Sequence, residues 1–159
     1  GVIYVPVTDT LYFGAEGLGA YKTANASAVE SVMWDTMSEA GQQLPLSAKR
    51  EDYVVVVSRS HLSPETEAFI EKARREHAHV STLSSGSSIK ICLVAEGTAD
   101  AYPRLAPTME WDTAAGDAIA RAAGSSVVEA GSGTPLRYNK ADLHNPSFIV
   151  RRDAKTMQS

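Results

Sequence analysis

The chain has 159 residues, of which 43% are hydrophobic, and its fifteen basic and nineteen acidic side chains leave a formal net charge of −4. This length allows one domain with a sizeable core, and the composition argues against intrinsic disorder. The mild acidic excess gives no electrostatic footprint for nucleic acid or an anionic membrane surface, and no apolar run approaches the roughly 20 residues of a bilayer span. The single cysteine, Cys92, excludes an internal disulfide and a multi-cysteine zinc site. We therefore expect a soluble protein of a reducing compartment.

The first part of the chain predicts strands and one short helix. Residues 2–7 and 10–13 have the composition of strands, and a turn-prone Thr-Asp pair separates them. The glycine-rich segment 14–19 predicts a hairpin turn. A phosphate-binding loop is the alternative, although these glycines have neither of the spacings known from nucleotide-binding loops. A short helix is expected around residues 29–40.

The middle of the chain predicts a buried strand followed by a helix. Residues 53–57 form a β-branched run that is typical of a strand buried on both faces. Ser63 and Pro64 then supply the cap and the first-turn proline that commonly begin a helix. A short strand is expected at residues 79–83, before the small-residue turn 84–88.

The rest of the chain alternates between helices and strands. The expected elements are a buried helix at 89–96, a strand at 99–104, an Ala-rich helix at 112–123, and strands at 126–129 and 147–150. Because no internal repeat or linker divides the chain, residues 1–150 are predicted to form one α/β unit with a mixed β-sheet flanked by helices. Residues 151–159 are predicted to form a polar tail.

Two predicted helix starts could carry chemistry, and the first is the segment 86–90, Gly-Ser-Ser-Ile-Lys. A helix N-terminus offers unpaired N–H groups to an anion. The hydroxyls of Ser87 and Ser88 add donors there, and Lys90 adds a positive charge in the first turn. The alternative is a plain N-cap, which serine supplies in any helix.

The second predicted helix start is the segment 111–116, Trp-Asp-Thr-Ala-Ala-Gly. Asp112 could bind a hard cation such as Mg²⁺, which prefers carboxylate oxygens together with substrate phosphate. One carboxylate is not a metal site, and Asp112 could equally cap the helix, where the dipole stabilises a negative charge. The small residues that follow allow a ligand or another backbone to approach closely.

Three further residues are candidates with different prospects. Arg104 ends a predicted strand, and its guanidinium suits phosphate, although a surface salt bridge is the commoner arrangement. His61 follows the buried strand 53–57, where open α/β sheets place ligand contacts. Cys92 has apolar helical neighbours and is interpreted as an inert core residue. The chain has no Gly-x-Ser-x-Gly elbow, so a hydrolase of the serine-triad type has little support.

Several segments together resemble the CysQ-type 3′(2′),5′-bisphosphate nucleotidases, which belong to the inositol monophosphatase-like superfamily of metal-dependent, lithium-sensitive phosphatases. These segments are residues 1–7, 57–61, 86–97, 101–104, 111–116, 133–138 and the Asn-Pro pair at 145–146. The tryptophan-aspartate motif is typical of the superfamily, and the serine-lysine helix with Tyr-Pro-Arg is typical of the nucleotidase branch. The resemblance covers nearly the whole chain except residues 23–50 and the tail.

The resemblance implies the C-terminal lobe of the sugar-phosphatase fold. It also implies Mg²⁺-dependent hydrolysis of adenosine 3′,5′-bisphosphate to AMP and phosphate, in support of sulfate assimilation. It assigns the substrate site to His61, Ser87, Ser88, Lys90, Arg104 and Asp112. Of these, Asp112 also matches a metal ligand, and His61 matches a histidine beside the adenosine. The resemblance further implies a cytoplasmic protein and leaves peripheral attachment to the inner face of the plasma membrane open.

The chain departs from the family pattern in its metal ligands. The family's other ligands lie in a Glu-Glu type motif and an Asp-Pro-Ile/Leu-Asp-Gly-Thr motif, and neither occurs in this sequence. The chain also opens directly in strand-like sequence, so we expect it to be the C-terminal lobe of a longer protein. By itself it is then expected to lack appreciable phosphatase activity and to bind Mg²⁺ weakly. A sheet edge left exposed by the missing part would favour self-association.

Two other functions stay open at this point. An inositol monophosphatase or sugar phosphatase of the same superfamily would share the chemistry, but a second cation such as Arg104 is superfluous for a monophosphate. A non-catalytic module would keep Lys90 and Arg104 and bind AMP or phosphate without turnover. A panel of substrates separates these functions, because the fold alone does not decide among them.

Overall fold

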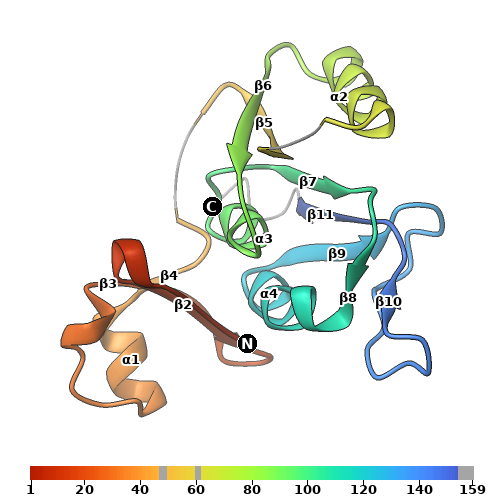
Figure 1. Ribbon diagram of the computed structural model, residues 1–159. Helices are drawn as coiled ribbons and strands as arrows, with labels where there is room; N and C mark the ends of the chain where they lie inside the picture. The colour runs from red at the N-terminus through yellow and green to blue at the C-terminus, as the bar shows by residue number, and fades with distance from the viewer. Residues whose placement is uncertain (47–49, 60–61, 154–159) are drawn as a thin grey trace.

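The computed structural model describes residues 1–46, 50–59 and 62–153 (Figure 1). Its strands form a four-stranded sheet, a five-stranded sheet and a two-stranded ladder. The elements in chain order are β1 (Val2–Val5), the 3₁₀ helix Pro6–Thr8, β2 (Thr10–Ala15), β3 (Gly19–Ala24), the 3₁₀ helix Ala26–Ala28, α1 (Trp34–Ala40), β4 (Gln42–Gln43), β5 (Tyr53–Ser58), α2 (Pro64–Glu76), β6 (Val80–Ser85), α3 (Ile89–Ala95), β7 (Ala101–Arg104), β8 (Thr108–Met109), α4 (Glu110–Ala122), β9 (Ser125–Glu129), β10 (His144–Asn145) and β11 (Phe148–Arg152).

The first sheet is antiparallel and has the strand order β1-β2-β3-β4. A tight turn joins β2 to β3, and Gly17 and Gly19 adopt φ values of +76° and +85° there, which other residues reach only with strain. This confirms the predicted hairpin turn rather than a phosphate-binding loop. The strand β3 itself was not predicted, because residues 19–24 mix small and polar side chains without clear alternation.

Two predicted boundaries in this region are wrong. The first strand ends at Val5 rather than at residue 7, because Pro6 begins a 3₁₀ helix. The helix expected from residue 29 begins only at Trp34. Trp34 packs edge-on against the stacked rings of Phe13 and Tyr21, with ring centroids 5.4 and 5.9 Å away, and this tertiary contact fixes where α1 lies.

The second sheet is mixed, with the strand order β6-β5-β7-β11-β9. Strand β5 runs parallel to β6 and β7, whereas β11 runs antiparallel to β7 and β9. The β-branched run in β5 is central, and Val55 and Val56 are fully buried. The predicted α/β class with a mixed sheet flanked by helices is confirmed.

Helices cover both faces of the mixed sheet (Figure 1). Val55 and Val57 of β5 face α2 and pack with Ile70, whereas Val56 points into the main core with Ile91 of α3 and Ile119 of α4. Helix α4 also packs on β1, β2 and β3 of the first sheet. The helices α3 and α4 therefore form a layer between the two sheets, and the main core lies around them.

A buried carboxylate ties the first sheet to the end of α3. Glu96 is 4% exposed and accepts hydrogen bonds from the Tyr12 hydroxyl at 2.8 Å and the Thr98 hydroxyl at 2.5 Å. Lys22 of β3 completes the arrangement with an ion pair at 2.6 Å. Because a buried charge is tolerated only when it is paired and hydrogen-bonded, these contacts fix the position of α3 relative to the first sheet.

Both ends of the chain bear on the predicted organisation. Strand β11 continues to Arg152, so a polar tail beginning at residue 151 is wrong: Arg151 and Arg152 pair with Ser126 and Ser125. Residues 154–159 lie outside the described residues, and a single lobe over 1–150 stays a prediction. At the other end, β1 forms one edge of the first sheet, with Val2 63% exposed. Self-association through this edge also stays a prediction.

Candidate active site

The mixed sheet places several predicted site residues where its parallel strands end. The carboxyl ends of β5, β6 and β7 lie on the same side of the sheet, which is where open α/β sheets bind ligands. Arg104 ends β7, and the turn after β6 leads into α3. A cavity of about 660 Å³ is lined by five of the predicted site residues: Ser87, Ser88, Lys90, Arg104 and Asp112. The sixth, His61, lies outside the described residues.

Lys90 is the most buried of these residues, with an exposed fraction of 6%. Its Nζ lies over the ring of Tyr102, 5.3 Å from the ring centroid. Burial lowers the pKa of Lys90, and the positive charges of Arg104 and Arg59 lower it further. This corner of the cavity therefore has an excess of positive charge that an anion would compensate.

Arg104 forms part of the same wall from β7. Its Nη2 donates a hydrogen bond to the carbonyl of Pro107 at 3.1 Å, which orients the guanidinium. Its Nε is buried and has no hydrogen-bond partner within the described part of the chain. A buried donor without a partner costs stability, which is consistent with a group that is kept for a ligand.

The two serines stand at the turn into α3. Ser88 occupies the N-cap position, but its hydroxyl makes no capping hydrogen bond. The plain N-cap alternative therefore does not account for it. Ser87 adopts a left-handed conformation with φ of +46°, an uncommon backbone for a serine. Both residues line the cavity next to Lys90.

Asp112 lines the cavity from α4. This helix begins at Glu110, two residues before the predicted start, so Asp112 sits in the first turn rather than at the cap. Its Oδ2 accepts a hydrogen bond from the backbone N–H of Met109 at 2.9 Å, so the predicted capping role holds as well. Capping and ligand binding are compatible, because a carboxylate has lone pairs on both oxygens.

The acidic side of the cavity fits Mg²⁺ only in part. A carboxylate oxygen is a suitable ligand for Mg²⁺, which also takes water and substrate phosphate oxygens, so Asp112 fits as one ligand. Across residues 1–46, 50–59 and 62–153, no group of three or more His, Cys, Asp or Glu side chains could hold a metal ion. The described residues therefore supply one ligand and not a complete set.

Helices α3 and α4 approach each other closely at Gly116. A Cβ atom built on Gly116 would lie 2.9 Å from Cδ1 and 3.1 Å from Cβ of Ile91, so a larger residue would force Ile91 to shift. Lys90 and Asp112 are carried by these two helices: Lys90 is next to Ile91 in the sequence, and Asp112 lies about one turn before Gly116. The small residues after Asp112, which the sequence interpreted as permitting close approach, thus set the spacing between the two sides of the cavity.

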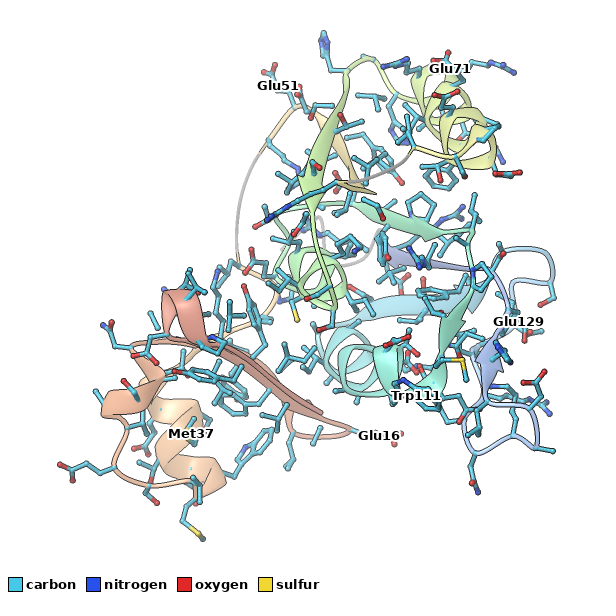
Figure 2. The ribbon with its side chains drawn as sticks, in the orientation of Figure 1. Glu16, Met37, Glu51, Glu71, Trp111 and Glu129 are labelled. Atoms are coloured by element: carbon cyan, nitrogen blue, oxygen red, sulfur yellow. The ribbon has the colours of Figure 1, made fainter. Side chains whose placement is uncertain are left out.

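Several cavity residues were not predicted. Tyr102 lies on the same face of β7 as Arg104, so the alternation of side chains along the strand could have indicated that it lines the cavity. Burial raises the pKa of Tyr102 to about 12. Trp111 is 67% exposed at the start of α4 (Figure 2). Ile3 and Tyr4 join the lining from β1. No sequence signal places β1 there, because its contact with α4 depends on tertiary packing.

Two smaller predictions concern chemistry elsewhere in the chain. Cys92 is fully buried in α3, and burial raises the pKa of its thiol to about 12, which confirms an inert core residue. Within the described residues, no helix is both long and apolar enough to cross a bilayer.

Comparison with known proteins gives the class to which this fold and cavity belong. Residues 1–158 match the sequence pattern of the inositol monophosphatase family. The chain belongs to the inositol monophosphatase family. Solved inositol monophosphatases share the fold at low identity: inositol monophosphatase II from Staphylococcus aureus is 19% identical, with a TM-score of 0.65 over 96% of this chain and 49% of that one.

Within the family, the chain is similar to CysQ proteins. It is 39% identical over 151 residues to the 3′(2′),5′-bisphosphate nucleotidase CysQ of Escherichia coli K12, covering 94% of this chain and 53% of the relative. It is 58% identical to the crystal structure of CysQ from Bacteroides thetaiotaomicron, with a TM-score of 0.90 over 96% of this chain and 57% of that one. The chain thus spans about half the length of the relatives it matches.

Proposed function

We propose that the complete protein is a 3′(2′),5′-bisphosphate nucleotidase that hydrolyses adenosine 3′,5′-bisphosphate to AMP and phosphate, in support of sulfate assimilation. The observation that carries this proposal is that Lys90, Arg104 and the carboxylate of Asp112 line one cavity. A substrate with two phosphates needs an anion site separate from the reacting phosphate. Two cations and a carboxylate around one cavity suit that division.

The cationic wall holds the phosphate that is not cleaved. Lys90 is buried, and its pKa is lowered chiefly by that burial, so a bound phosphate stabilises the charged ammonium. The Nε of Arg104, which has no partner among the described residues, offers a further donor, and the hydroxyl of Ser88, which makes no capping hydrogen bond, offers another. Charge-assisted hydrogen bonds of this kind orient the nucleotide as well as bind it. We assign His61 to the adenosine, as the resemblance to the family implies.

Asp112 holds one Mg²⁺ ion in this proposal. When bound, Mg²⁺ neutralises charge on the reacting phosphate and lowers the pKa of a bound water. The hydrogen bond from the Met109 N–H to Asp112 fixes the direction of the carboxylate. We infer that the other ligands come from outside the described residues, and that the chain of 159 residues alone has no appreciable turnover.

The alternatives differ in substrate or in turnover. Solved inositol monophosphatases share the fold, but identities near 20% carry no argument about substrate. A monophosphate substrate would leave Arg104 or Lys90 without a partner anion, which disfavours an inositol or sugar monophosphatase. A phosphate-binding module without catalysis would bind AMP equally well. We place the protein in the cytoplasm, and no described feature supports attachment to the plasma membrane.

The test is phosphate release by the complete gene product with Mg²⁺, with and without lithium. The expected result is lithium-sensitive release from adenosine 3′,5′-bisphosphate, with slower release from inositol monophosphate and fructose 1,6-bisphosphate. Faster turnover of either of those two would reassign the substrate. Tight AMP binding without release from any substrate would support the non-catalytic module instead.

A further inference from the structure

A single asparagine holds the start of α4 in place. Asn145 lies on β10, which pairs with β8 immediately before α4, and it is 7% exposed. Its side-chain nitrogen contacts three acceptors: the Thr108 hydroxyl at 3.2 Å, the Met109 carbonyl at 2.8 Å and the Thr113 hydroxyl at 2.9 Å. One buried amide therefore joins the strand before the helix to the first turn of the helix.

The residues that Asn145 contacts lie on both sides of Asp112 in the sequence. Met109, whose carbonyl accepts from Asn145, is also the residue whose N–H donates to the carboxylate of Asp112 at 2.9 Å. Thr113, the next residue along, accepts from Asn145 and lines the same cavity as Asp112. A displacement of the amide would therefore disturb the backbone at Met109 and the side chain of Thr113, the residues on the two sides of Asp112 in the sequence.

The carbonyl oxygen of the Asn145 amide indicates that this residue is not there for packing alone. The Oδ1 atom of Asn145 is buried and has no hydrogen-bond partner among the described residues. A buried acceptor without a partner lowers stability, so the amide is satisfied only through its nitrogen. The arrangement is costly for folding and specific for the segment that carries Asp112.

We propose that Asn145 is a positioning residue, which fixes the first turn of α4 and thereby the carboxylate of Asp112 at the cavity. This inference rests on the proposed function, because it assigns Asn145 a part in that reaction. It separates two kinds of residue: Lys90 and Arg104 contact the substrate, whereas Asn145 acts only through Asp112. Its loss should slow the reaction and leave binding at the cationic wall intact.

The first test compares Asn145→Ala with Ser147→Ala in the complete gene product. Ser147 is a matched control, because its hydroxyl also donates to a backbone carbonyl, that of Leu105 at 3.3 Å, and among the described residues this acceptor lies outside α4. Residues that orient a metal ligand typically change metal affinity or activity about 10–100-fold when lost. We expect Asn145→Ala to lower kcat by about that factor and to leave inhibition by AMP unchanged, and Ser147→Ala to change neither.

A second pair of variants keeps the proposal testable if Asn145→Ala folds poorly. Thr113→Ser retains the hydroxyl that accepts from Asn145, whereas Thr113→Val removes it at nearly the same volume. The expected result is near-normal kcat for the serine variant and reduced kcat for the valine variant. Hydrogen exchange at the amides of residues 110–114, measured without Mg²⁺, should quicken in Asn145→Ala and Thr113→Val only.

The outcomes separate this inference from the proposed function. An active wild type with unchanged kcat in Asn145→Ala and Thr113→Val overturns the positioning role and leaves the function standing. Equal losses of kcat and of AMP inhibition also overturn it, because they report a general collapse of the cavity. A wild type that releases no phosphate from adenosine 3′,5′-bisphosphate overturns the proposed function, and the positioning role in that reaction falls with it.

Discussion

The two sides of the cavity are built in different ways. Lys90 and Arg104 come from a buried helix and from the end of a sheet strand, and both are oriented by contacts within the described residues, the Tyr102 ring and the Pro107 carbonyl. The residues of α4 that line the cavity include one carboxylate, Asp112, in the first turn of the helix. We therefore propose that the chain carries an anion site beside one ligand of a metal site. Binding and turnover should therefore be separable in this protein.

The largest expected effect is that of Asp112→Asn on turnover. The amide oxygen can still accept from the Met109 N–H, so the helix start is retained. Loss of the negative charge should lower kcat of the complete gene product by more than about 100-fold, beyond the range seen for residues that only orient a ligand. AMP affinity, measured by calorimetry on the 159-residue chain, should stay within about threefold. A parallel loss of AMP affinity would show that the two sides are not separable.

Lys90→Met tests the cationic residues of the cavity, and we expect it to weaken AMP binding but to increase stability. Loss of a charge-assisted hydrogen bond should weaken AMP binding by about 1.5–3 kcal/mol, or about tenfold to a hundredfold. The folded-state pKa of Lys90 lies below its unfolded value, so its charge opposes folding at all pH values below that folded pKa. At neutral pH the methionine should therefore raise the midpoint of thermal unfolding. A variant that lost both affinity and stability would mark Lys90 as structural.

Gly116→Ala tests whether the spacing between α3 and α4 affects both stability and AMP binding. The added Cβ would lie 2.9 Å from Cδ1 of Ile91, and overpacking of this kind costs about 1–3 kcal/mol. Thermal unfolding should report that loss, and AMP affinity should fall because Lys90 moves with α3. Adding Ile91→Val removes the nearest atom and should recover part of both losses. Additive effects of the two substitutions would contradict the contact.

The smallest expected effect is the dependence of AMP binding on pH. Phosphate is fully ionised above about pH 8, so a change between about pH 8 and about pH 10.5 reports on the protein. Affinity should fall as the pH rises through the lowered pKa of Lys90, by less than the loss in Lys90→Met, because only the charge is removed. Lys90→Met should show weaker binding without this fall. The same slope in both proteins would assign the titration to another group.

The sequence singled out five residues that line the cavity, but it did not predict the geometry that brings them together. Ser87, Ser88, Lys90, Arg104 and Asp112 each stood at a predicted element boundary, and strand and helix ends are legible because turn and cap chemistry is local. The same local signals left each residue with a structural alternative. Only the pairing of β5 with β6 and β7 brings their ends to one edge, and register between distant strands leaves little trace in a single sequence.

Most of the misses have a common physical cause. The start of α1 and the contact of β1 with the cavity depend on packing between segments that are not neighbours in the chain, whereas β3 was missed because its residues do not alternate clearly. Trp34 begins α1 against Phe13 and Tyr21, which no local cap signal announces. Asn145 was noted only as part of an Asn-Pro pair, and its contacts with Met109 and Thr113 join positions more than thirty residues apart. Such contacts require the fold to be known.

The most direct test of the separation between binding and turnover uses the 159-residue chain itself. Calorimetric titration with AMP and phosphate release from adenosine 3′,5′-bisphosphate with Mg²⁺ would be measured on the same sample. We predict AMP binding that Lys90→Met weakens, together with no phosphate release above that of Asp112→Asn. Phosphate release that Asp112→Asn abolishes would show that the chain holds a complete catalytic set. An absence of AMP binding would contradict the anion site on which the account depends.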